Sequence, residues 1–87
     1  MTPSETIRST VTNDGMVLLD VSNGKIFSSN AVGARIWLKL QEGSDLETIV
    51  SQVGAEFNVL PEHVRPDVEA FLEHLKANGI VIERALR

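Results

Sequence analysis

The chain has 87 residues, no cysteine and a net charge of −4, which predicts a single domain without disulfides or thiolate chemistry. With 43% hydrophobic and 23% charged residues, the composition fits a folded globule and excludes a disordered chain. No apolar run approaches the roughly 20 residues that cross a membrane, and the first residues lack the basic and apolar regions of a signal peptide. We therefore expect a cytoplasmic protein without a membrane partner.

The first third of the chain predicts an antiparallel sheet. Residues 1–6 are polar and predict a flexible N-terminus, followed by one domain over residues 7–84. Residues 7–12 and 16–21 have the alternation and β-branched content of strands. The second of these carries apolar residues on both faces, so we expect a central strand that is covered on both sides for part of its length.

A third strand, residues 25–28, follows an Asn23-Gly24 dipeptide that is typical of hairpin turns. Two registers are open: a two-residue turn pairs Val21 with Ile26, and a three-residue loop pairs Leu19 with Phe27. Because a one-residue slip turns a strand over, the sequence leaves open whether Ile26 or Phe27 points into the core.

Helix onset directly after residue 28 leaves the third strand little scope for another neighbour. It is therefore expected to be a free sheet edge, and an exposed edge can accept an extended peptide.

Three helices are predicted over residues 30–42, 45–57 and 61–78. Ser29 or Asn30 can cap the first helix, Gly43 ends it, and its buried stripe comprises Gly33, Ile36, Trp37 and Leu40. Ser44 and Glu47 have the spacing of a capping box for the second helix.

Pro66 is awkward within the third helix, because in a helix begun at Pro61 it removes one hydrogen bond and clashes with the preceding turn. We expect either a kink at Pro66 or a regular helix that starts later, near Val64. The whole order, three strands and then three helices, predicts an α+β fold of the winged helix-turn-helix type.

Catalytic patterns are absent from the sequence. His63 and His74 stand eleven residues apart on one helix, roughly 16 Å along its axis, which is too far to share a metal. No nucleophile, phosphate-loop or dinucleotide motif is present. We expect neither an active site nor a metal or cofactor.

Trp37 and Asp67 each have two interpretations. Trp37 lies at the centre of an apolar stripe and is interpreted as a core residue, with a binding surface as the alternative. Asp67 borders the apolar face of the third helix, either as a flanking carboxylate favoured by the helix dipole or as a carboxylate at the lip of a groove.

The patterns D-G-x-V-L-L-D, G-K-x-F-x-x-N-x-V-G-A-R-I-W, S-D-L-E-x-I-V and D-V-E-A-F-L together resemble the PqqD-like family over about residues 11–81. Members are peptide-recognition domains of pathways that modify ribosomally made peptides. The G-A-R-I-W helix is most similar to the stand-alone leader-binding proteins of lasso-peptide biosynthesis. Ser29 departs from the family, which usually has leucine there, and so do Leu60 and Pro66.

The resemblance implies that a precursor's leader peptide adds as a strand to the third strand, in a groove walled by the third helix. The implied peptide-binding residues are Lys25, Ile26, Phe27, Ser28 and Ser29 on the strand and Val64, Asp67, Val68, Phe71 and Leu75 on the helix. It also implies delivery of the leader to a leader peptidase, a transglutaminase-like cysteine protease. We expect a monomer or a weak dimer.

Two alternative functions remain. One is presentation of a peptide to a radical or cyclodehydratase enzyme in another pathway, which the residues do not distinguish from the lasso interpretation. The other is a winged-helix nucleic-acid-binding protein. That class needs clustered basic residues on an exposed helix, whereas the last two helices carry an excess of acidic residues, so no nucleic-acid partner is expected.

Overall fold

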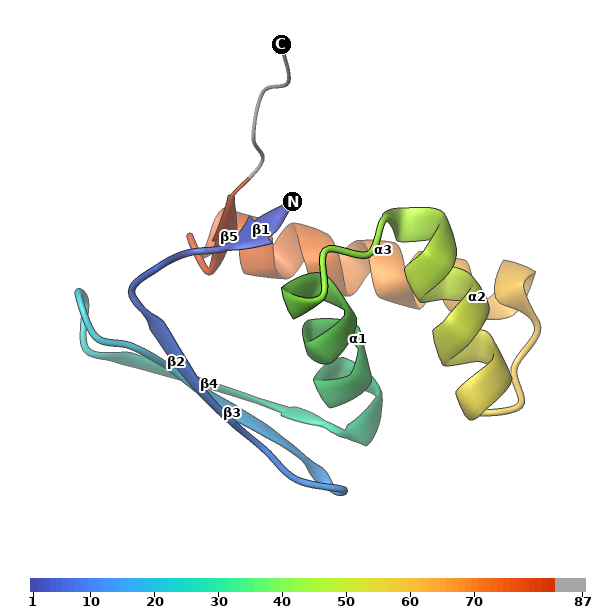
Figure 1. Cartoon of the computed structure of the whole chain (residues 1–87), viewed down its shortest axis with the longest axis horizontal. Coiled ribbons are helices and arrows are strands. Elements are labelled where there is room, and N and C mark those ends of the chain that lie inside the picture. The colour runs from blue at the N-terminus through green and yellow to red at the C-terminus, as the bar shows by residue number, and fades with distance from the viewer. Residues whose placement is uncertain (83–87) are drawn as a thin grey trace, which may run out of the picture.

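The computed structural model describes residues 1–82, which form an α+β domain (Figure 1). Along the chain the elements are β1 (Thr2–Pro3), β2 (Ile7–Val11), β3 (Gly15–Asp20), β4 (Lys25–Asn30), α1 (Ala31–Gln41), α2 (Leu46–Glu56), α3 (Pro61–Ala77) and β5 (Val81–Ile82). Strands β2, β3 and β4 form an antiparallel sheet with β3 in the centre. The predicted fold class, a three-stranded antiparallel sheet followed by three helices, is confirmed.

The first residues of the chain form a short ladder that the sequence did not predict. β1 pairs with β5, with Thr2 opposite Ile82 and Pro3 opposite Val81, and the Ser4 N–H donates to the Ile80 carbonyl at 2.8 Å. These contacts join residues 2–4 to β5 and to Ile80, which precedes it, and the flexibility expected over residues 1–6 remains a prediction. Glu83 and Arg84, the end of the predicted domain, lie outside the described residues.

The central strand β3 is covered on one face only, contrary to the expectation of cover on both. Met16 and Leu18 are buried, whereas Val17 and Leu19 are 48% and 38% exposed. The reason is the layering seen in Figure 1, where α1 packs on one side of the sheet and none of the helices formed by residues 1–82 lies on the other. The outer face of the sheet therefore keeps apolar residues in contact with solvent.

The β3–β4 hairpin has neither of the two predicted registers. Leu19 pairs with Ile26 and Leu18 with Phe27, which leaves a four-residue loop over residues 21–24. Phe27 therefore shares the inner face with Leu18 and packs against the core, while Ile26 points outward and is 70% exposed.

Asp20 explains the longer loop. Its backbone carbonyl accepts hydrogen bonds from the N–H groups of Asn23 and Gly24 at 3.3 and 2.8 Å. Its carboxylate accepts from the Ser22 hydroxyl at 2.8 Å, from the Asn23 amide at 2.9 Å and from the Thr6 hydroxyl at 3.1 Å. Within residues 1–82 it is the one buried charged side chain. The hydrogen bonds to the carboxylate, led by those from Ser22 and Asn23, lower the pKa of Asp20 from its ordinary 3.8 to about 2.

The lowered pKa predicts a pH-dependent contribution to stability. A carboxyl whose pKa falls on folding stabilises the fold above its unfolded pKa, and this contribution is lost as pH falls through its folded pKa. For Asp20 the window therefore runs from about pH 4 down to about pH 2. We expect the thermal midpoint of Asp20→Asn to lie below that of the wild type at pH 5, and the difference to shrink toward pH 2. Circular dichroism melts measure it, and an unchanged difference across the window would contradict the role of Asp20.

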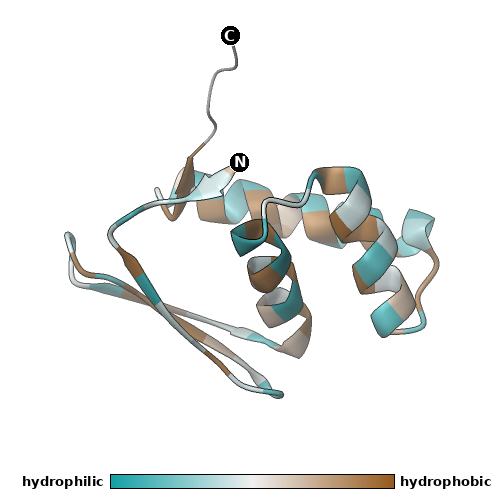
Figure 2. Ribbon diagram, in the orientation of Figure 1, coloured by the Kyte–Doolittle hydropathy of each residue, from teal (hydrophilic) through white to brown (hydrophobic). Residues whose placement is uncertain are grey.

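The helices enclose the core on the inner face of the sheet, and hydrophobic residues recur along each of them in Figure 2. Asn30 caps α1, because its side-chain oxygen accepts from the Gly33 N–H at 3.0 Å. All four residues of the stripe predicted for α1 are buried, and Trp37 is a core residue with 1% exposure. Among the described residues no helix is both long and apolar enough to cross a membrane.

The predicted capping box of α2 is wrong. Asp45 is the cap and accepts from the Thr48 N–H at 2.8 Å, which lowers the pKa of Asp45. Glu47 reaches away from the cap to α3, where the Arg65 guanidinium donates to both of its oxygens and lowers the pKa of Glu47. A two-pronged contact with arginine therefore replaces the expected contact with the helix start.

Helix α3 begins at Pro61 and continues through Pro66, so the alternative of a regular helix that starts near Val64 is wrong. Pro61 occupies the start of the helix, where a missing N–H costs nothing. Leu60 stands at the cap without a side-chain hydrogen bond. The bond removed by Pro66 is the one to the Glu62 carbonyl, and Glu62 lies on the exposed surface, where water can satisfy that group.

Candidate functional site

The free edge expected from the sequence is present on β4. β4 pairs with β3 along one edge, and within the described residues no strand pairs with its other edge. The backbone N–H and C=O groups on that side are therefore available to an added strand. A further strand paired with β4 would exclude peptide docking at this edge, and residues 1–82 form no such strand.

A cavity of about 280 Å³ lies where β4 runs into α1 and faces α3. This volume is large enough for one or two apolar side chains. Three elements line it, with the residues Ser29, Asn30, Val32, Gly33, Ile36, Asp67 and Phe71. The cavity thus lies at the end of the free edge, so a peptide paired with β4 would pass its mouth.

Gly33 allows the three elements to meet at this point. A Cβ atom on residue 33 would overlap the Ser29 hydroxyl oxygen, lie 2.7 Å from the Ser29 Cβ and lie 3.1 Å from the Phe71 ring. Distances below 3.0 Å require a neighbour to shift. The absence of a side chain at Gly33 therefore sets the width of the cavity between β4 and α3.

The structure divides the five wall residues expected on α3 into two groups. Asp67 and Phe71 line the cavity, Asp67 on the exposed surface and Phe71 partly buried. Val64, Val68 and Leu75 are buried in the core, with exposures of 5% or less. These three support the wall from behind, and they offer almost no surface to a ligand.

The five edge residues expected on β4 also differ in what they present. Ile26 and Ser28 point to the outer face, Phe27 packs inward, and Ser29 faces the cavity. Lys25 is exposed at the start of the strand, opposite Asp20. Along an antiparallel strand the N–H and C=O groups of successive residues point alternately to one neighbour and to the other, so alternate residues of this set bond to β3 and the remaining ones offer main-chain hydrogen bonds to a paired peptide.

Sequence reasoning missed the part of the cavity formed by the start of α1. Asn30, Val32, Gly33 and Ile36 line it, yet Gly33 and Ile36 were expected only as members of a buried stripe. A glycine on the apolar stripe of a helix indicates that another element approaches closely. Gly33 could therefore have pointed to the start of α1 as part of the cavity wall.

The site suits non-covalent binding of an extended chain. Among the described residues that line it, Asp67 is the one with a charge, and the others are apolar or carry hydroxyl or amide groups. Over residues 1–82 no group of three metal-ligating side chains is found. A strand at the edge would be fixed by backbone bonds, and its alternate side chains would be sorted between the cavity and the outer face.

The fold and this groove define a winged-helix-like α+β domain with an open sheet edge beside a helical wall. The profile of the PqqD family, described as coenzyme PQQ synthesis protein D, matches residues 15–81. The chain therefore belongs to the PqqD family. Among curated protein sequences none matches it.

Two solved structures are similar to the chain over nearly its whole length. One is TbiB1 in complex with the TbiA(beta) leader peptide, at 35% identity and a TM-score of 0.88, with 99% of this chain and 100% of that chain covered. The other is lasso peptide synthetase B1 complexed with the leader peptide, at 27% identity and a TM-score of 0.82, with 93% and 95% covered. The resemblance to the PqqD family and to the leader-binding proteins of lasso-peptide biosynthesis is confirmed.

Proposed function

We propose that this protein binds the leader peptide of a ribosomally made precursor, in a lasso-peptide pathway, as a strand added to β4. The observation that carries the proposal is the unpaired edge of β4 next to the cavity lined by Asp67 and Phe71. The two similar structures support it, because both are complexes with a leader peptide. The protein acts by binding alone, and it delivers the leader to a leader peptidase of the transglutaminase-like cysteine protease type.

The energetics require both parts of the site. Each backbone hydrogen bond to an added strand contributes about 0.5–1.5 kcal/mol net, and β4 offers only a short edge. An apolar leader side chain buried in the cavity adds about 1.5–3 kcal/mol. Ordering a flexible peptide offsets several kcal/mol of this sum. Strand pairing alone is therefore too weak, and the cavity supplies the anchor.

Binding of a labelled leader tests the proposal. We would titrate the protein into a fluorescein-labelled leader peptide, taken from a precursor encoded next to the gene for this chain, and follow fluorescence anisotropy. Saturable binding of the leader, with much weaker binding of a scrambled peptide of the same composition, is the expected result. Equal binding of the two peptides would contradict sequence-specific leader recognition.

Two other functions predict different results in binding experiments. Presentation to a radical or cyclodehydratase enzyme predicts that the leader of such a pathway's precursor binds instead. Nucleic-acid binding predicts a gel shift at low salt that falls steeply as salt is added. The acidic residues at the cap of α2 and along α2 and α3, among them Asp45, Glu47, Glu62 and Glu69, disfavour that outcome.

A further inference from the structure

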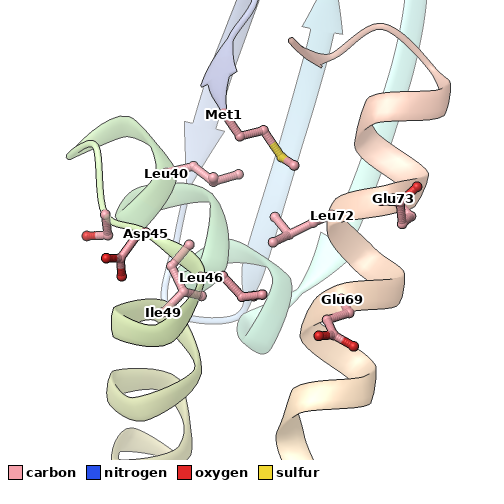
Figure 3. Close-up of a pocket in the computed structure, with 9 residues that line it drawn as sticks. Met1, Leu40, Asp45, Leu46, Ile49, Glu69, Leu72 and Glu73 are labelled. Atoms are coloured by element: carbon pink, nitrogen blue, oxygen red, sulfur yellow. The ribbon is translucent and has the colours of Figure 1, made fainter. Parts of the chain in front are cut away.

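Ile26 on β4 is 70% exposed, the highest value among the large hydrophobic residues of the described chain. A cavity of about 510 Å³ between α1, α2 and α3, shown in Figure 3, is larger than the cavity next to β4. Three of its apolar lining residues, Leu40, Ile49 and Leu72, are nevertheless at most 6% exposed. Those three offer little surface to a ligand, whereas most of the Ile26 side chain remains open to one at the free edge of the sheet.

The hydrogen bonds between β2 and β3 show which main-chain groups of β4 face the free edge. The Val21 N–H, just after β3, donates to the Thr6 carbonyl at 3.0 Å. At the other end of β3, the Gly15 carbonyl accepts from the Thr12 N–H at 2.8 Å. Main-chain groups at the odd positions from 15 to 21 therefore point to β2. Successive residues of an antiparallel strand alternate between its two neighbours, so positions 16, 18 and 20 bond to β4.

The partners of these even positions on β4 are Lys25, Phe27 and Ser29. Their main-chain groups are taken by β3, so those of Ile26 and Ser28 point to the free edge. Residues of an added antiparallel strand that lie opposite Ile26 and Ser28 exchange hydrogen bonds with them and place their side chains on the same face. This is the outer face of the sheet, because Phe27 packs on the core and Ser29 faces the cavity.

On the outer face, Ile26 ends a row of side chains that crosses the sheet. Leu19 on β3 lies directly opposite Ile26, and Arg8 on β2 lies opposite Leu19. The pair of Leu19 and Ile26 makes the end of this row at the free edge apolar and exposed. The next row contains Val17 and reaches the free edge at Ser28. The edge therefore presents an apolar side chain at one hydrogen-bonding position and a small hydroxyl at the other.

We propose that Ile26 determines part of the leader specificity, by pairing with a large apolar leader side chain that lies opposite it on the outer face of the sheet. The inference rests on the proposed function, the addition of the leader as a strand to β4. Apolar cross-strand pairs stabilise a sheet, and such a pair would cover the exposed surface of Ile26. The side chains of a strand alternate between its faces. The leader residue on Ile26 and the one that enters the cavity at Phe71 are therefore separated by an odd number of positions.

An alanine scan of the labelled leader against three proteins tests the pairing. Each leader variant would be titrated by fluorescence anisotropy with the wild type, Ile26→Thr and Phe71→Ala. Ile26→Thr keeps a β-branched side chain suited to a strand and makes it polar. It should weaken binding of the unchanged leader about two- to fivefold, the range of a cross-strand pair. At one leader position, alanine should cost affinity in the wild type and cost little in Ile26→Thr.

The spacing of the leader positions gives the sharper result. The leader position that depends on Ile26 should lie an odd number of residues from the position that depends in the same way on Phe71. Ile82→Thr, the same substitution at another partly exposed isoleucine, in β5, is the matched control and should depend on no leader position.

The outcomes separate this inference from the proposed function. Unchanged affinity of Ile26→Thr, or an even separation between the two leader positions, would overturn the pairing at Ile26 while leader binding stands. Absence of saturable leader binding to the wild type would overturn the proposed function, and the pairing at Ile26 with it.

Discussion

Phe71→Ala is expected to weaken leader binding about 10- to 100-fold, the equivalent of losing about 1.5–3 kcal/mol of apolar burial. The ring of Phe71 lines the cavity and is itself only partly buried, so it has surface left to cover a ligand side chain. Anisotropy titration of the labelled leader measures the loss.

The matched control is Ile82→Ala, which truncates another partly exposed apolar residue, 45% exposed, in β5 rather than in the groove. Its leader affinity should stay close to that of the wild type. If Phe71→Ala and Ile82→Ala bind the leader equally well, α3 is not part of the site.

Gly33→Ala should reduce leader affinity by about 10-fold or more, because the added methyl group takes space in which a leader side chain would otherwise bury about 1.5–3 kcal/mol of apolar surface. The new methyl group would overlap the Ser29 side chain and crowd the Phe71 ring. Either neighbour must move, and the methyl group itself narrows the cavity where a leader side chain would lie.

Two further variants separate a blocked groove from a weakened fold. Gly54→Ala also forces a shift, since its Cβ would lie 2.7 Å from the Val59 carbonyl oxygen, but neither Gly54 nor Val59 lines the groove. It should lower stability with little effect on leader affinity. Adding Ser29→Gly to Gly33→Ala removes the overlapping side chain and should restore part of the binding. Loss of affinity in Gly54→Ala equal to that in Gly33→Ala would refute the steric account.

The elements of the fold were predictable because their signals are local. Alternation marks the strands, and the spacing of Ile36, Trp37 and Leu40 marks the buried stripe of α1. The hairpin register was not predictable, since it depends on Asp20, whose carboxylate bonds to Thr6, Ser22 and Asn23 at once. The β1–β5 ladder joins the two ends of the described chain, and two-residue strands leave no periodic signal.

The site shows the same division between local and tertiary information. The free edge of β4 was predictable because a helix begins directly after this strand in the sequence. The position of Asp67 at the border of the apolar face of α3 was also predictable, from the helical spacing of its neighbours. Which α3 residues reach the surface depends on how α1 and α2 pack against it, so Val64, Val68 and Leu75 could not be separated from Phe71 in advance. The role of Gly33 emerges only when Ser29 and Phe71 are placed beside it.

The most direct measurement compares amide exchange rates, chemical shifts and intermolecular contacts by NMR in the protein with and without the bound leader. Leader recognition at the open edge predicts that amides of β4 on its unpaired side become protected from exchange, with cross-strand contacts between the leader and residues 25–30 and further shifts at Asp67 and Phe71. A leader that binds while those β4 amides exchange as fast as in the free protein, with its contacts confined to other surfaces, would contradict the account.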